Sequence, residues 1–238
     1  RRGALHPAEM SRIVVQEGAD AGICLDGDAD RCLFSDEKGR LLDGDALICL
    51  SAMHLLERWL LRSNKVVLTV MSNLGLIRFL RTHGVSVVSV PVGDRNVTEA
   101  IDKESLSLGG ENSGHIIFRS FASTGDGLLT ALQTLAALKA SGKPLSWHRR
   151  SYHATPQIIN NLKLKAARKT PLQDLPRLTS LIGRCERRLK GEGRVFVRYS
   201  GTEPLLRIML EGPKAPLIRR MARDLARTYL AETAEAHH

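Results

Sequence analysis

The chain has 238 residues, of which 43% are apolar and 25% charged, so it can fold around one large or two small hydrophobic cores. Its four cysteines form no Cys-x-x-Cys pair and lie at no metal-ligand spacing from a histidine, which argues against a disulfide framework or structural zinc and favours a reducing compartment. The longest apolar stretch, 46–61, is interrupted by a histidine and two charged residues, and the N-terminus carries no apolar signal core, so we expect a cytoplasmic chain with no membrane partner.

The net charge of +10 is distributed unevenly along the chain. Residues 1–142 carry 15 basic and 17 acidic side chains, whereas residues 143–238 carry 20 and 8. A basic C-terminal module is suited to nucleic acid, an anionic surface or a small phosphorylated ligand. Because aromatic residues make up only 4% of the chain, bases have little to stack on, and we expect no nucleic-acid partner.

Helix and strand signals alternate through the first 142 residues. This alternation predicts an α/β domain in which helices cover a mixed, mostly parallel sheet. After the acidic loop at 26–31 we expect a hairpin. The predicted helices span 7–17, 44–61, 74–83, 95–103 and 124–141, and the predicted strands span 21–25, 32–35, 41–42, 65–70, 85–90, 106–108 and 116–118.

The turn at 142–144 marks a boundary, because both the charge balance and the pattern change there. Beyond it, strands at 157–164, 195–199 and 205–211 and helices at 172–181 and 216–231 predict a small α+β module.

An acidic loop follows the first apolar run. Asp26, Asp28 and Asp30 alternate along it, so in extended geometry their carboxylates point to one side and can converge on a hard cation. The glycine and distal glutamate of a calcium loop are absent, so three carboxylates with open positions fit magnesium bound together with a phosphate oxygen. Arg31 is placed to hold that phosphate, whereas the alternative is a solvated acidic turn.

A glycine-rich loop at 109–115 joins two strand-like runs. Glu111 and Ser113 are two residues apart, so they share a side and could hydrogen-bond adjacent sugar hydroxyls. His115 shares that parity and could move a proton to or from a hydroxyl during phosphoryl transfer. By itself such a loop is more often structural.

A third loop, 198–204, lies between two predicted strands. Two hydroxyls, the backbone N–H groups around a glycine and two arginines are the donors that a phosphate needs. The alternative is a polar hairpin turn with solvated arginines. The candidate phosphate ligands are Arg198, Ser200, Gly201, Thr202 and Arg207.

Taken together, these segments resemble the α-D-phosphohexomutase superfamily, and within it the phosphoglucosamine mutase branch. Three residues depart from the branch pattern: Asn96 stands where it usually has Tyr, Asn112 where it has Gln, and Tyr199 where it has Lys. The matching segments occur in family order and are 25–31, 70–75, 92–95, 110–115, 124–127 and 198–204.

The resemblance implies four domains around a cleft, with 1–60 completing the second, 61–146 forming the third and 147–238 the fourth, mobile and phosphate-binding one. It also implies that a phosphoserine phosphorylates a hexosamine 6-phosphate, giving a 1,6-bisphosphate that is resolved to the 1-phosphate. Mg²⁺ would bind the three aspartates and the phosphoserine, with Arg31 and His115 as catalytic residues. The substrate would contact Arg95, Glu111, Ser113 and the candidate phosphate ligands of the third loop.

The phosphoserine segment that the resemblance requires, Thr-x-Ser-His-like, is absent from these residues. We therefore expect a C-terminal fragment whose partners are the missing N-terminal domains of the same protein, and which is inactive alone. An uncovered apolar face would favour self-association, including a homodimer. The alternatives are a phosphomannomutase or phosphoglucomutase, and a non-catalytic phosphosugar-binding module.

Overall fold

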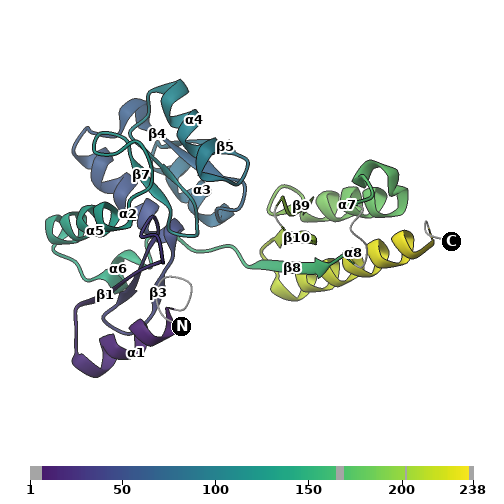
Figure 1. Ribbon diagram of the computed structural model, residues 1–238, viewed down its shortest axis with the longest axis horizontal. Coiled ribbons are helices and arrows are strands. Elements are labelled where there is room, and N and C mark those ends of the chain that lie inside the picture. The colour runs from purple at the N-terminus through teal and green to yellow at the C-terminus, as the bar shows by residue number, and fades with distance from the viewer. Residues whose placement is uncertain (1–6, 165–168, 202, 236–238) are drawn as a thin grey trace. The chain divides into compact units, whose positions relative to one another are not determined.

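The computed structural model describes residues 7–164, 169–201 and 203–235. The chain forms two compact units, Arg1–Ala154 and Thr155–His238, and Figure 1 labels most of their elements. Across the described ranges, no helix has both the length and the apolar composition needed to cross a bilayer.

The first unit begins with helix α1, Ala8–Glu17, which ends at Gly18 in the left-handed conformation (φ 60°). An antiparallel sheet in the order β1-β2-β3 follows, and its central strand β2 is buried along its whole length. The acidic loop connects β1 to β2, and the expected hairpin is formed by β2 and β3. The strands span Ala21–Leu25, Cys32–Asp36 and Leu41–Leu42.

A second sheet of the first unit has the order β5-β4-β6-β7, with β4 parallel to both neighbours and β7 antiparallel to β6. The prediction of a mixed, mostly parallel sheet is confirmed. Because β-branched and leucine side chains alternate across both faces of β4, each face can bury apolar surface. The strands span Lys65–Thr69, Ser86–Val90, Leu108–Gly110 and Ile116–Phe118.

Helices cover both faces of this sheet. Val66 and Leu68 of β4 belong to the main core with α2, α3 and α5, whereas Val67 packs with Ile101 of α4 in a separate cluster on the other face. Asp43, Asn73 and Asp126 cap α2, α3 and α5, respectively. The side-chain oxygen of each residue accepts a hydrogen bond from a backbone N–H at the start of its helix. The helices span Gly44–Glu57 (α2), Leu74–Thr82 (α3), Asp94–Glu104 (α4), Gly127–Ser141 (α5) and Leu145–His148 (α6), with a 3-10 turn η1 at Arg62–Asn64.

The second unit is a sheet in the order β8-β10-β9, all antiparallel, with two helices packed on it. Leu206, Ile208 and Leu210 of β10 alternate into a core shared with both helices. The carboxylate of Glu232 in α8 accepts hydrogen bonds from two backbone N–H groups in the first turn of α7, so the start of α7 lies beside the end of α8. The elements span Gln157–Lys163 (β8), Leu172–Asp174 (η2), Pro176–Leu189 (α7), Arg194–Tyr199 (β9), Leu205–Glu211 (β10) and Ala215–Glu235 (α8).

Several predicted elements have other bounds in the structure, among them the helix expected at 44–61, which ends at Glu57, and two of these differences have a clear physical reason. The strand expected at 106–108 lies at Leu108–Gly110, because Gly109 packs so closely on β4 that an added Cβ would lie 2.8 Å from the Cβ of Val67. The helix expected at 172–181 begins at Pro176, since proline fits the first helical position and disfavours helix before it. It continues to Leu189 because buried apolar side chains recur at helical spacing.

Candidate functional site

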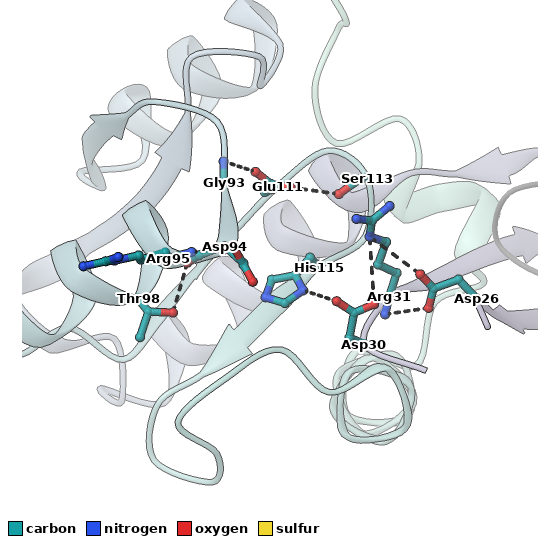
Figure 2. A network of polar contacts seen from close by, with 10 residues as sticks. All are labelled: Asp26, Asp30, Arg31, Gly93, Asp94, Arg95, Thr98, Glu111, Ser113 and His115. Atoms are coloured by element: carbon teal, nitrogen blue, oxygen red, sulfur yellow. Dashed lines mark hydrogen bonds and ion pairs between the residues drawn. The ribbon is translucent and has the colours of Figure 1, made fainter. Parts of the chain in front are cut away.

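The acidic loop and the glycine-rich loop lie against each other in the first unit, although about 85 residues of sequence separate them. Arg31 and His115 form an isolated antiparallel bridge, and the Cys32 N–H donates to the Gly114 carbonyl at 3.1 Å. The Gly44 N–H donates to the Asn112 carbonyl at 3.0 Å, where an added Cβ would lie 2.6 Å from the Gly114 nitrogen. Backbone contacts therefore fix one loop against the other, as Figure 2 shows for their side chains.

Three carboxylates converge at the acidic loop, although the loop is bent rather than extended and Ala29 has a left-handed conformation (φ 59°). Asp26, Asp28 and Asp30 each offer an oxygen within 4.8 Å of the other two. The Arg31 N–H donates to Asp26 Oδ1 at 3.1 Å, and its Nε lies 3.6 Å from Asp26 Oδ2 and 3.9 Å from Asp30 Oδ1. Among the described residues, Asp30 Oδ1 is buried without a hydrogen-bond donor. Three hard oxygen ligands, one of them unsatisfied, fit Mg²⁺.

His115 joins this cluster from the other loop. Its Nδ1 lies 3.0 Å from Asp30 Oδ2, and since a carboxylate only accepts, Nδ1 carries the proton. The residue is 2% exposed, and Nε2 has no hydrogen-bond partner in the described part of the chain. An added Cβ at Gly125 would lie 2.5 Å from Nε2, so this glycine leaves the space that the ring occupies. When the ring is neutral, Nε2 is thus a buried acceptor close to the carboxylates.

Glu111 and Ser113 contact each other within their loop, which forms a turn rather than the extended geometry that the parity argument assumes. Glu111 Oε2 accepts a hydrogen bond from Ser113 Oγ at 3.2 Å, and its Oε1 accepts one from the Gly93 N–H at 2.9 Å. The second bond connects the glycine-rich loop to the start of α4. Glu111 is 8% exposed, so its carboxylate is held in place rather than solvated.

The start of α4 places two charged side chains differently. Figure 2 shows the Asp94 carboxylate directed toward the His115 ring, whereas Arg95 is turned away from it. Arg95 donates to Glu99 at 2.7 Å and its side chain is 87% exposed, so the structure does not bring it to the cluster. Sequence reasoning missed Asp94, whose position in the matched segment 92–95 was the available signal.

The third loop lies in the second unit, between β9 and β10. Arg198 and Arg207 are direct partners across the ladder, and Arg207 donates to Glu203 at 3.0 Å. Ser200 is 3% exposed and its hydroxyl accepts from the Glu203 N–H at 3.3 Å, whereas Gly201 is exposed. Thr202 lies outside the described residues. That this loop joins the other two around one sugar phosphate stays a prediction.

Lys169 adds a cation to this loop that sequence reasoning missed. Its ammonium donates to the Ser200 carbonyl at 2.7 Å and lies 6.0 Å from the centroid of the Tyr199 ring. The Tyr199 hydroxyl donates to the Thr170 carbonyl at 2.6 Å, and burial, followed by its contact with Tyr229, raises the pKa of that phenol. The tyrosine that stands where the branch usually has lysine is therefore neutral, and a lysine from a neighbouring segment is present instead.

Sequence comparison identifies both parts of the chain. Residues 43–154 match the family profile described as "Phosphoglucomutase/phosphomannomutase, alpha/beta/alpha domain III", and residues 160–228 match "Phosphoglucomutase/phosphomannomutase, C-terminal domain". The phosphoglucosamine mutase of Geobacter sp. (strain M21) is 48% identical over 94% of this chain and 49% of its own length. That of Cereibacter sphaeroides is 46% identical over 94% and 50%. The chain thus spans about half the length of these curated relatives.

Solved structures have the same fold. N-acetylphosphoglucosamine mutase of Aspergillus fumigatus, in complex with GlcNAc-6P and magnesium, aligns with a TM-score of 0.76 at 21% identity, over 95% of this chain and 56% of that one. A phosphoglucomutase/phosphomannomutase family protein of Burkholderia thailandensis aligns with a TM-score of 0.73 at 19% identity, over 97% and 50%.

Proposed function

Since the chain belongs to the phosphoglucomutase/phosphomannomutase family, we propose that it forms the C-terminal half of a phosphoglucosamine mutase, an isomerase. That enzyme would interconvert glucosamine 6-phosphate and glucosamine 1-phosphate through a phosphoserine and a 1,6-bisphosphate in amino-sugar nucleotide synthesis. The identity to curated phosphoglucosamine mutases over nearly the whole chain supports the amino-sugar branch.

The observation that carries the proposal is the contact of His115 with the carboxylate cluster. The Asp30 carboxylate accepts the Nδ1 proton, and 3.0 Å separate Nδ1 from Oδ2. In a neutral ring, Nε2 is then the only nitrogen that can accept a hydrogen bond. A sugar hydroxyl that attacks a phosphoryl group must lose its proton, and Nε2 is the group that would accept it. The same nitrogen would return the proton when the phosphate leaves in the reverse direction.

Asp26, Asp28 and Asp30 would hold Mg²⁺, which when bound would stabilise the negative charge that develops on the transferring phosphoryl group. Arg31 would orient that group, because its guanidinium lies over Asp26 and Asp30 at ion-pair distance and is 39% exposed. Glu111 would accept hydrogen bonds from sugar hydroxyls, and Ser113 would donate to them. Their mutual hydrogen bond of 3.2 Å is long for an O–H···O bond, so sugar hydroxyls could replace it.

The loop of the second unit would bind the phosphate that is not reacting. Arg198 and Arg207 lie directly opposite each other, and like charges in that position destabilise a sheet. Glu203 forms an ion pair with Arg207, and a phosphate dianion held between the two guanidinium groups would offset their mutual repulsion. Lys169, which donates to the Ser200 carbonyl, would stabilise the conformation of this loop.

The phosphoryl donor would come from residues outside this sequence, since no Thr-x-Ser-His-like segment occurs within it. These 238 residues would therefore bind substrate and metal without turnover, and Mg²⁺ binding would be weak without the fourth anionic ligand. The missing N-terminal domains would be the main partner. A stripe of exposed leucines on α5 (Leu128, Leu132 and Leu135) would be a contact for them, or for a second copy when they are absent.

Isothermal titration of the chain with glucosamine 6-phosphate tests this proposal. We expect binding that Arg207→Gln and Ser113→Ala weaken, whereas Arg219→Gln, a matched loss of charge on an exposed face of α8, leaves it unchanged. Glucose 6-phosphate and mannose 6-phosphate should bind more weakly. Stronger binding of either would favour the glucose or mannose branch, and no binding of any of the three would contradict the proposal.

A further inference from the structure

Eight arginines of the second unit lie on its two helices, away from the loop at 198–204, which is called the phosphate loop below. Helix α7 carries four arginines and one glutamate, and α8 carries four arginines over its first 13 residues. The proposed function uses none of them. The arginines are Arg177, Arg184, Arg187 and Arg188 on α7, and Arg219, Arg220, Arg223 and Arg227 on α8.

A groove of about 570 Å³ runs between the two helices. Its floor is apolar, and each helix contributes to it at the spacing of one helical face. Four arginines line its edges, and Asp224 is the one acidic side chain among the described lining residues. The floor consists of Leu181, Cys185, Leu217 and Met221, and the edges carry Arg184, Arg187, Arg188 and Arg220.

The positive charge at the groove is poorly neutralised. Among the described residues, Arg184 donates to the uncharged Ser180 hydroxyl at 3.1 Å and to no carboxylate. Arg220 lies 3.9 Å from Asp224, which also pairs with Arg227 at 2.8 Å. Arg184 and Arg188 are one helical turn apart, an arrangement of like charges that destabilises a helix. The partial negative charge at the C-terminal end of α7 attracts Arg188 in the last turn and explains its position. It does not explain the positions of Arg184 or Arg220.

The groove and the phosphate loop lie at opposite ends of this unit. The end of α7 and the start of α8 meet at Gly212, where an added Cβ would lie 2.9 Å from both Leu189 and Ile218. The phosphate loop lies at the other end of β10, where Tyr199 contacts Tyr229 near the end of α8. A ligand of the groove therefore does not compete directly with a phosphate at Ser200.

We propose that this groove binds an acidic amphipathic helix of a partner protein, with apolar side chains on the floor and carboxylates on the arginines at the edges. Charge complementarity selects an acidic occupant, and the recessed apolar floor requires one with apolar anchors as well. Nucleic acid would leave the floor unfilled, and no aromatic side chain is present among the described lining residues for bases to stack on. A flat membrane surface would not reach the floor.

Fluorescence anisotropy of the full chain with a labelled model peptide tests the proposal. The peptide has about 14 residues, with leucines at every third or fourth position and glutamates between them. We expect binding that weakens between about 0.05 M and about 0.5 M NaCl, and that Arg184→Glu and Arg188→Glu each weaken about tenfold. Arg219→Glu, the same charge reversal on a face of α8 outside the groove, is the control and should leave the affinity nearly unchanged.

Circular dichroism melting establishes that each variant is folded before its affinity is compared. A scrambled peptide of the same composition should bind at least about tenfold more weakly, because it cannot present its leucines on one face. Equal binding of the scrambled peptide, or equal weakening by Arg184→Glu and Arg219→Glu, would overturn the proposal. Binding of a single-stranded oligonucleotide or anionic phosphatidylserine vesicles that depends on Arg184, without peptide binding, would overturn it in favour of those ligands.

Discussion

Replacing Gly125 by alanine should displace His115 from the carboxylate cluster. An alanine Cβ at this position would lie 2.5 Å from Nε2 and 2.6 Å from Nδ1 of the His115 ring. Non-bonded atoms require about 3.5 Å, so the ring or the loop must move by about 1 Å. The ring is 2% exposed and has little free space to enter, which makes the substitution a direct probe of the site.

The expected cost follows from the same contact. A movement of about 1 Å would lengthen the 3.0 Å bond between His115 Nδ1 and Asp30 beyond hydrogen-bonding distance. Overpacking costs about 1–3 kcal/mol, and leaving a buried ring nitrogen without its partner costs about 1–3 kcal/mol more. Partial relaxation reduces the sum, so we expect the free energy of unfolding to fall by about 2–4 kcal/mol.

Urea denaturation of Gly125→Ala measures this loss, and the histidine ring signals in a ¹H–¹³C NMR spectrum report whether His115 has moved. Gly27→Ala is the matched control, because it lies in the acidic loop itself with nothing within 4 Å of an added Cβ. We expect the control to change stability by less than about 0.5 kcal/mol. Equal stabilities of the two variants, with an unshifted His115 signal, would refute the packing argument.

Three further predictions concern Asp36, the cysteines and Lys169. Burial by itself would raise the pKa of Asp36, but bonds from Arg40 and backbone N–H groups outweigh it and lower the pKa; we therefore expect Asp36→Asn to cost about 1–3 kcal/mol at pH 7. Urea titrations should show this difference shrinking as pH falls below about 4, through the lowered pKa, and a pH-independent difference would contradict it. Burial raises the pKa of the Cys32 and Cys49 thiols to about 12, and all four cysteines are free and buried. Ellman's reagent should therefore label them only after unfolding, and rapid labelling of the native chain would contradict their burial. Lys169→Met should weaken glucosamine 6-phosphate binding about fivefold, or ~1 kcal/mol, in calorimetry, and an unchanged affinity would exclude a role at the Ser200 loop.

Local sequence signals predict most of the fold because they reflect local physics. A continuous apolar, β-branched run in β4 and helical spacing in α3 and α4 identify those elements within one or two residues. Leu108–Gly110 is different, since two glycines have low strand propensity and form a strand only through pairing with β4 and β7. Packing between segments that are far apart in the sequence determines where that strand forms, so a local sequence pattern does not predict it.

The candidate site divides in the same way. The sequence indicates a cluster of Asp26, Asp28 and Asp30 because all three lie within one short loop, although that loop is bent at Ala29 rather than extended. The hydrogen bond from Lys169 to Ser200 joins segments 31 residues apart and leaves no local signal. The basic charge of the C-terminal module predicts an anionic ligand but not its position, since four arginines of α7 and α8 line the groove, at the other end of the unit from the loop at 198–204.

The most direct test is ³¹P NMR of the chain mixed with glucosamine 6-phosphate and Mg²⁺. If these residues supply the metal, sugar and phosphate loops of a mutase but not its phosphoryl donor, the 6-phosphate signal will broaden or shift on binding, and no glucosamine 1-phosphate signal will appear. Formation of the 1-phosphate would show that the chain holds its own donor. A signal that the chain leaves unchanged would show that these loops do not form a sugar-phosphate site.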